Sequence, residues 1–116
     1  MAWRQYGRLH VERGRSVIKA SGQALAEEYF GYHMEGEPRG FYRWLHHGQV
    51  LMLDDLDKVD YGEPRYARMM RELWDEIYAH QWPVIVTANE PISYFETTLG
   101  ASCARRMREA TREIRF

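Results

Sequence analysis

A run of four apolar residues that ends in two consecutive carboxylates, V-L-M-L-D-D at residues 50–55, constrains the fold more than any other segment. A short unbroken apolar run is typical of a strand buried on both faces, as in a parallel sheet. Acidic residues at the carboxyl end of such a strand lie where open α/β folds bind ligands. The segment therefore predicts an interior strand of a parallel sheet, with Asp54 and Asp55 in a polar site at its end.

The most regular helical periodicity begins near Pro64 and runs to Tyr78. Its apolar residues recur at intervals of three and four, as they do on a helix that packs one face on a core. Pro64 suits the first turn of such a helix, and Pro83 lies beyond its end. We expect this face to pack on the sheet rather than to bind a cofactor. The stripe consists of Tyr66, Met69, Met70, Leu73, Trp74, Ile77 and Tyr78.

The other segments alternate between strand and helix patterns, and Ser21 is a good N-cap for one of the helices. Strands are predicted over residues 15–20, 49–53, 84–88 and 112–116, and helices over residues 1–13, 21–30, 39–47, 92–99 and 101–110. A chain of 116 residues is long enough for one domain with one modest core. The alternation predicts an α/β fold in which helices cover both faces of a parallel sheet, giving three α/β/α layers.

Composition excludes several classes of protein. The net charge of −1 gives no global basic field for nucleic acid, although residues 105–116 hold five arginines and two glutamates. Cys103 is the single cysteine, so an internal disulfide is excluded and a reducing, cytoplasmic location fits best. No apolar run approaches the roughly 18 residues of a membrane span. The first residues lack the apolar core of a secretory signal.

The acidic pair and three later motifs together resemble the AAA+ ATPases, specifically the bacterial and phage helicase loaders and their transposition relatives. In that family a Walker B strand ends in two acids, the next strand ends in T-x-N, and a short helix ends in L-G. An arginine finger follows in a helix of the form R-I-x-x-R-M. The matching motifs here are Asp54-Asp55, Thr87-Ala88-Asn89, Leu99-Gly100 and Arg106-Met107, while Ser102 replaces the first arginine of the finger helix.

The resemblance implies a role for each matching residue. Asp54 resembles the acid that holds Mg²⁺, and Asp55 resembles the acid that orients the attacking water. Asn89 resembles sensor 1, with Thr87 just before it at the nucleotide. Arg106, or its neighbour Arg105, resembles the finger that reaches the nucleotide of an adjacent subunit.

The phosphate-binding loop of these ATPases, G-x-x-x-x-G-K-[ST], is absent from the 116 residues. The resemblance therefore implies one AAA+-like domain over residues 1–116 without its first strand and P-loop. Residues 1–14 would match the helix that normally follows the P-loop, and residues 15–116 the rest of the core. Mg²⁺ and ATP are cofactors implied for a full-length parent. The chain alone is expected not to hydrolyse ATP, because a P-loop supplies the phosphate cradle.

The resemblance also suggests partners. The P-loop strand of the family lies beside the sensor 1 strand, so residues 84–88 would keep an unpaired edge that favours self-association or binding to AAA+ subunits. A replicative helicase is a further candidate partner. Single-stranded DNA is another, since Tyr61, Tyr66 and the arginines near the carboxyl end could stack on bases, although core packing of the tyrosines is favoured. No membrane partner is expected.

The sequence leaves two other functions and two other sites open. The chain could be a non-enzymatic module that docks on an AAA+ loader or helicase, or an unrelated α/β enzyme using Asp54 and Asp55 as an acid pair. His33, His46 and His47 could ligate a metal, but adjacent histidines on a helix point about 100° apart and no H-x-x-x-H is present. A surface helix end is favoured there, and Cys103 is predicted to be a small buried thiol.

Overall fold

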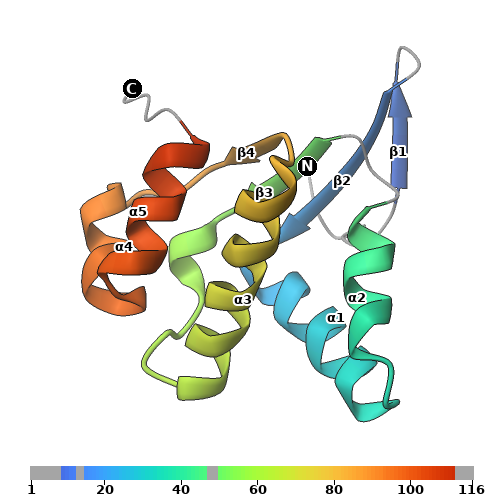
Figure 1. The fold of residues 1–116 in the computed structure, drawn as a ribbon, viewed down its shortest axis with the longest axis horizontal. Helices are drawn as coiled ribbons and strands as arrows, with labels where there is room; N and C mark the ends of the chain where they lie inside the picture. The colour runs from blue at the N-terminus through green and yellow to red at the C-terminus, as the bar shows by residue number, and fades with distance from the viewer. Residues whose placement is uncertain (1–8, 13–14, 47–49, 112–116) are drawn as a thin grey trace.

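One four-stranded sheet and five α-helices make up the residues that the structure, a computed structural model, describes: 9–12, 15–46 and 50–111 (Figure 1). The strands are β1 (Leu9–Glu12), β2 (Arg15–Ser21), β3 (Val50–Asp54) and β4 (Val84–Val86). The helices are α1 (Gly22–Met34), α2 (Pro38–Leu45), α3 (Pro64–His80), α4 (Ile92–Leu99) and α5 (Ala101–Ala110), and η2 (Leu56–Lys58) is a single 3₁₀ turn.

The sheet has the order β1-β2-β3-β4. Strands β2, β3 and β4 are parallel, while β1 pairs antiparallel with β2. The prediction that residues 50–53 form an interior strand of a parallel sheet is therefore confirmed. Register pairs Ser21 with Asp54 and Leu53 with Val86, so the carboxyl ends of the three parallel strands meet at one edge of the sheet.

The two faces of the sheet differ in burial. Ile18, Leu51 and Leu53 lie on one face and belong to a single core with residues from all five helices. On the other face Met52 is half-buried, and Ile85 beside it is 50% exposed. Helices α1, α2 and α3 lie together on one side of the strands (Figure 1). Within the described ranges, then, helices cover one face, and the second helical layer of the predicted three-layer fold is not among them.

Local signals explain the ends of the two longest helices. The Ser21 hydroxyl caps α1 by accepting a hydrogen bond from the Ala24 amide at 3.0 Å, as predicted. Helix α3 has Pro64 in its first turn and ends at Gln81, whose backbone is left-handed with φ 49°. The predicted stripe of α3 is confirmed for five residues that are buried: Met69, Met70, Leu73, Trp74 and Ile77. Tyr66 is half-buried, and Tyr78 is 46% exposed. None of the described helices is both long and apolar enough to cross a bilayer.

Four expectations need correction or lie outside what is described. Leu9–Glu12 form a strand, so the helix predicted over residues 1–13 is wrong there, and residues 1–8 are outside the described ranges. The helix predicted over residues 21–30 continues to Met34, so its end was predicted about one turn too early. Strand β4 is three residues long, shorter than predicted. The strand predicted over residues 112–116 is not described.

Candidate functional site

Two carboxylates lie at the end of β3, where the backbone turns sharply. Asp54 is its last residue and is half-buried, whereas Asp55 is exposed. The backbone of Asp55 is left-handed, with φ 52° and ψ 47°. Few residues other than glycine adopt this conformation, but aspartate does so more readily because its short polar side chain can bond locally. The turn separates the two carboxylates, so that each faces a different environment.

The Thr87 hydroxyl joins the ends of β3 and β4. It donates a hydrogen bond to Oδ1 of Asp54 and accepts one from the Asp55 amide at 3.1 Å. The Thr87 amide donates to the Leu53 carbonyl at 2.9 Å, and its carbonyl accepts from the Leu56 amide at 3.1 Å. Four hydrogen bonds on one residue thus fix the positions of both acids relative to the T-A-N segment that follows β4.

Asp57 makes a second connection between the same two loops. Its Oδ2 accepts a hydrogen bond from the backbone N–H of Asn89 at 3.2 Å. Nζ of Lys58 lies 3.9 Å from the same oxygen. The Asp57 side chain is only 3% exposed, and its Oδ1 has no hydrogen-bond partner among the described residues. No motif in the sequence marks Asp57 as part of the site. In the sequence, Asp57 is one of several aspartates in an acidic loop, and the sequence does not show which of them is buried.

The predicted site residues of the sheet therefore come together. Asp54 and Thr87 are in direct contact, Asp55 is bonded to Thr87 through its amide, and Asn89 is held at the same edge by its own amide. Carboxylate and hydroxyl oxygens are the ligands that Mg²⁺ prefers. The chemistry of this donor set fits Mg²⁺, while the 116 residues contain no P-loop sequence to fit the phosphates.

The two candidate finger residues lie on α5, and their surroundings differ. Arg106 is engaged within the domain: its Nη1 lies 3.2 Å from Asp75 Oδ1 and donates to the Ser102 hydroxyl at 2.9 Å. Its guanidinium also lies 5.9 Å from the centre of the Tyr78 ring. Arg105 is exposed. Of the two arginines, Arg105 is the one whose side chain is presented to solvent.

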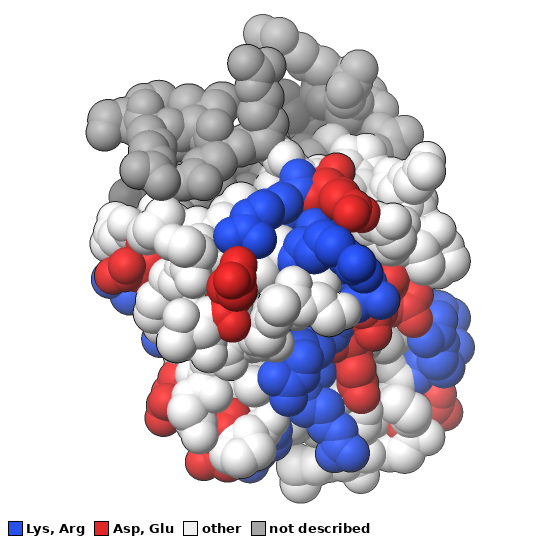
Figure 2. Space-filling model, turned by 60° about the vertical axis from the view of Figure 1, so that its left-hand side comes forward, with Lys and Arg blue, Asp and Glu red and all other residues white. Residues whose placement is uncertain are grey.

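The basic character predicted near the carboxyl end is neutralised in part. Arg108 Nη2 lies 3.0 Å from Glu96 Oε2, an ion pair between α5 and α4. Figure 2 turns this side of the molecule forward and shows acidic side chains interspersed among the basic ones. Residues 112 and 115, two of the five arginines in the predicted patch, lie outside the described ranges. The described part of this surface is one of mixed charge.

The tyrosines proposed for base stacking are packed against the protein. Tyr61 is 6% exposed and donates from its hydroxyl to the Leu56 carbonyl at 2.7 Å. Burial, with Tyr94, Cys103 and Asp57 as lesser causes, raises the pKa of its hydroxyl. Tyr66 is half-buried, and Arg65 lies over its ring. Tyr61 is thus a core residue in this conformation and cannot stack on a base.

A further hollow among the described residues lies away from the acidic pair. A space of about 630 Å³ opens between the α1–α2 hairpin and α3, where Tyr42, Glu72, Glu76 and His80 contribute to its lining. Asp54 and Asp55 do not line it. The carboxyl edge of the sheet is the stronger candidate site, because the hydrogen bonds there bring predicted residues from two strands together.

Cys103 is a core residue, as predicted. It is 3% exposed on α5. Burial, followed by the Asp75 carboxylate, raises the pKa of its thiol to about 11, so the thiolate is scarce at neutral pH. This environment is the opposite of the electropositive, accessible surroundings of a nucleophilic cysteine.

Comparison of the chain with models of protein families gives no match. Comparison with curated proteins and with solved structures gives no match either. The candidate site is therefore described by its own geometry.

Proposed function

We propose that the chain is part of an AAA+ ATPase of helicase-loader type that acts in DNA replication, carrying the Walker B and sensor 1 elements. The observation that supports this most is the hydrogen bond from the Thr87 hydroxyl to the Asp54 carboxylate. This bond joins the end of β3, where the two acids lie, to the end of the neighbouring parallel strand β4, where T-x-N begins. The resemblance requires these two strands to be adjacent, and β3 and β4 are.

The carboxyl edge of the sheet has the residues that such a site needs. Asp54, oriented by Thr87, would hold Mg²⁺ through one carboxylate oxygen. Bound Mg²⁺ neutralises charge that develops on a transferred phosphoryl group. The exposed Asp55 carboxylate would orient the attacking water, since its left-handed turn directs it away from the core. The backbone N–H of Asn89 is bonded to Asp57, so its side chain would be free to contact the terminal phosphate.

Arg105 fits the proposed finger better than Arg106. A finger must leave its own subunit to stabilise charge on the nucleotide of a neighbour. Arg106 is held by Asp75 and Ser102, and breaking these contacts would oppose that reach. Arg105, one residue earlier on the same helix, is exposed.

The first prediction concerns nucleotide binding by the chain alone. Asp54 and Asp55 present negative charge to a triphosphate, and the sequence contains no P-loop lysine or amide cradle to offset it. We therefore expect no heat of binding when Mg²⁺–ATP at micromolar concentration is titrated into the purified chain in a calorimeter. A micromolar dissociation constant would overturn this expectation.

The coding sequence upstream of Met1 tests the proposed function itself. An open reading frame that continues through G-x-x-x-x-G-K-[ST], preceded by an apolar strand, would support a full-length ATPase. A frame that is closed there, with no separate P-loop chain encoded beside it, would count against the ATPase proposal.

A second candidate function is a non-enzymatic module that docks on an intact AAA+ subunit. Two observations favour it: β4 is an edge strand of the described sheet, and Ile85 in that strand is 50% exposed. An open parallel edge can pair with a strand of another chain. The exposed Arg105 would then face the partner's nucleotide.

We expect this docking to change ATP turnover by an intact helicase loader when the chain is added in excess. Arg105→Ala should lose most of the effect, because the proposed contact is electrostatic and made by that guanidinium. Arg108→Ala is the matched control, since Arg108 lies on the same helix and is paired with Glu96 inside the domain. Equal effects of the two variants, or no change in turnover with the unmodified chain, would exclude this mode of docking.

A further inference from the structure

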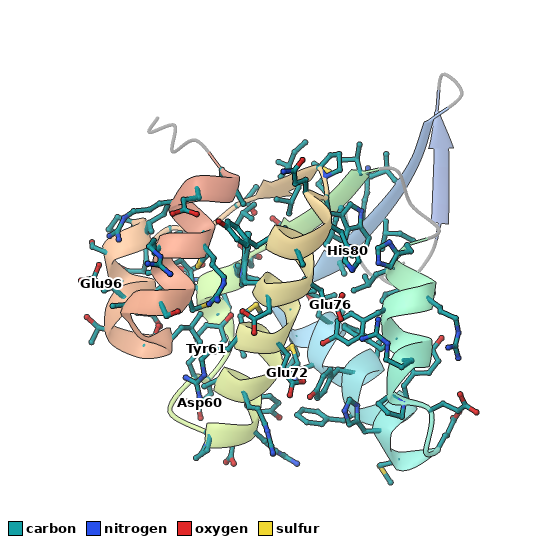
Figure 3. All side chains as sticks on the ribbon, in the orientation of Figure 1. Asp60, Tyr61, Glu72, Glu76, His80 and Glu96 are labelled. Carbon is teal, nitrogen blue, oxygen red and sulfur yellow. The ribbon has the colours of Figure 1, made fainter. Side chains whose placement is uncertain are left out.

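Three metal-ligating side chains from two parts of the chain meet beside the end of α3. His46 directly follows α2, and Glu76 and His80 lie one turn apart on α3. One potential ligand atom from each residue lies within 4.8 Å of the other two. Figure 3 shows Glu76 and His80 on the same side of α3, directed towards α2. The cluster lies near the C-terminal end of α3. It does not include the acidic pair at the sheet edge.

The Glu76–His80 pair already has a geometry close to that of a shared metal. Nε2 of His80 lies 3.1 Å from Oε2 of Glu76. Two ligand atoms about 2.0–2.2 Å from one tetrahedral ion are separated by a similar distance. A metal ion would take the place of the shared proton between these two atoms. The i, i+4 spacing on a helix is what allows both side chains to reach one point.

His46 is held in place by an aromatic neighbour. Its ring stacks on Trp82 with 4.4 Å between ring centroids and 4° between ring planes. Trp82 is only 7% exposed, so the indole is a fixed platform. The rings of His46 and His80 lie 5.2 Å apart at 87°. The third ligand is thus preorganised from outside α3, which an ordinary helical ion pair does not provide.

Arg39 acts on the remaining oxygen of Glu76. Its Nη1 donates to Oε1 at 2.6 Å, which leaves Oε2 directed towards His80. A hydrogen-bond partner of this kind orients a ligating carboxylate. The guanidinium charge also opposes a cation nearby, so the affinity should be moderate rather than that of a structural zinc site.

We propose that His46, Glu76 and His80 form a binding site for a divalent transition metal, for which Zn²⁺ is the probe. Two imidazoles and a carboxylate suit zinc and similar ions better than Mg²⁺ or Ca²⁺, which take oxygen ligands. Solvent would complete the coordination, because His80 is 51% exposed. A bound ion would join the end of α2 to α3. The inference does not depend on the proposed ATPase function.

The test is a Zn²⁺ titration of the untagged full chain after treatment with a chelator. We expect one ion per chain in calorimetry and a higher melting temperature in the presence of Zn²⁺. His46→Ala and His80→Ala should each weaken binding at least about tenfold, since losing a direct ligand costs no less than losing a second-shell partner. Both side chains are exposed, so the variants should fold, and circular dichroism checks this.

The matched control is His33→Ala. His33 is an exposed histidine at the end of α1 that contacts the Tyr29 carbonyl at 2.9 Å and is not one of the three clustered residues. It should bind Zn²⁺ as the unmodified chain does. The proposal is wrong if the unmodified chain shows no Zn²⁺ binding, or if His46→Ala and His80→Ala retain the affinity of the His33→Ala control.

Discussion

Replacing Trp74 with alanine should remove a large part of the chain's stability. Trp74 is fully buried in α3 and is the largest fully buried side chain in the part of the chain that the structure describes. Truncating a buried tryptophan costs about 3–5 kcal/mol through lost burial and the cavity left behind. A domain typically has about 5–15 kcal/mol of stability in total. Urea denaturation followed by circular dichroism should show a markedly lower midpoint, or an unfolded chain in water.

Trp74→Phe distinguishes the effect of lost side-chain volume from the effect of the buried polar N–H group of the indole. The indole Nε1 is buried without a hydrogen-bond partner among the described residues. An unsatisfied buried donor costs about 1–3 kcal/mol, and phenylalanine removes it while keeping most of the ring. We therefore expect Trp74→Phe to lose less than half of what Trp74→Ala loses. If the alanine variant loses well under the minimum of about 3 kcal/mol, the core around α3 is not packed as the structure has it.

Gly22→Ala is the second substitution with a large expected effect. A Cβ atom at this first residue of α1 would lie 2.5 Å from Cγ2 of Val59, which is 3% exposed. Overpacking of this kind costs typically about 1–3 kcal/mol. Relief requires the Val59 side chain to move within the core to which it belongs. Thermal and urea denaturation should both show the loss of stability.

Gly31→Ala is the matched control, because Gly31 lies on the same helix and a Cβ atom added there would meet nothing within 4 Å beyond its own helix. Alanine there should stabilise the chain by about 0.4–1 kcal/mol through a less flexible unfolded state. Adding Val59→Ala to Gly22→Ala should recover part of the loss by removing the clashing methyl. If Gly22→Ala proves as stable as Gly31→Ala, the close approach of α1 to the loop after β3 is not present.

Periodicity predicted most helices and the parallel strands, but it failed at the start of the chain. Leu9 and Val11 fitted the helix pattern predicted over residues 1–13, yet Leu9–Glu12 pair with β2. Four residues carry too little pattern to distinguish a helix turn from a strand. The pairing that decides between them, Leu9 with Ile18, is a contact that local sequence does not encode.

Strand order alone predicted which residues lie at the same edge of the sheet, but not how their side chains contact one another. Asp54 and Thr87 were expected at one edge because parallel neighbours end together. The hydroxyl that joins them, and the burial of Asp57, depend on side-chain geometry and could not be foreseen. The same holds for His46: sequence reasoning grouped it with His33 and His47, whereas the structure places it beside Glu76 and His80. The E-x-x-x-H spacing of residues 76–80 was the available signal.

The sheet is fully buried on one face and less buried on the other, so its positions differ in how well they tolerate mutation. Ile18, Leu51 and Leu53 can change only with compensating changes in the helices that touch them. Ile85, pointing the opposite way and 50% exposed, can accept threonine or lysine at small cost, because surface substitutions rarely perturb stability. Evolution or design can therefore alter what the outer side of the sheet attracts while leaving untouched the interior that supports Asp54.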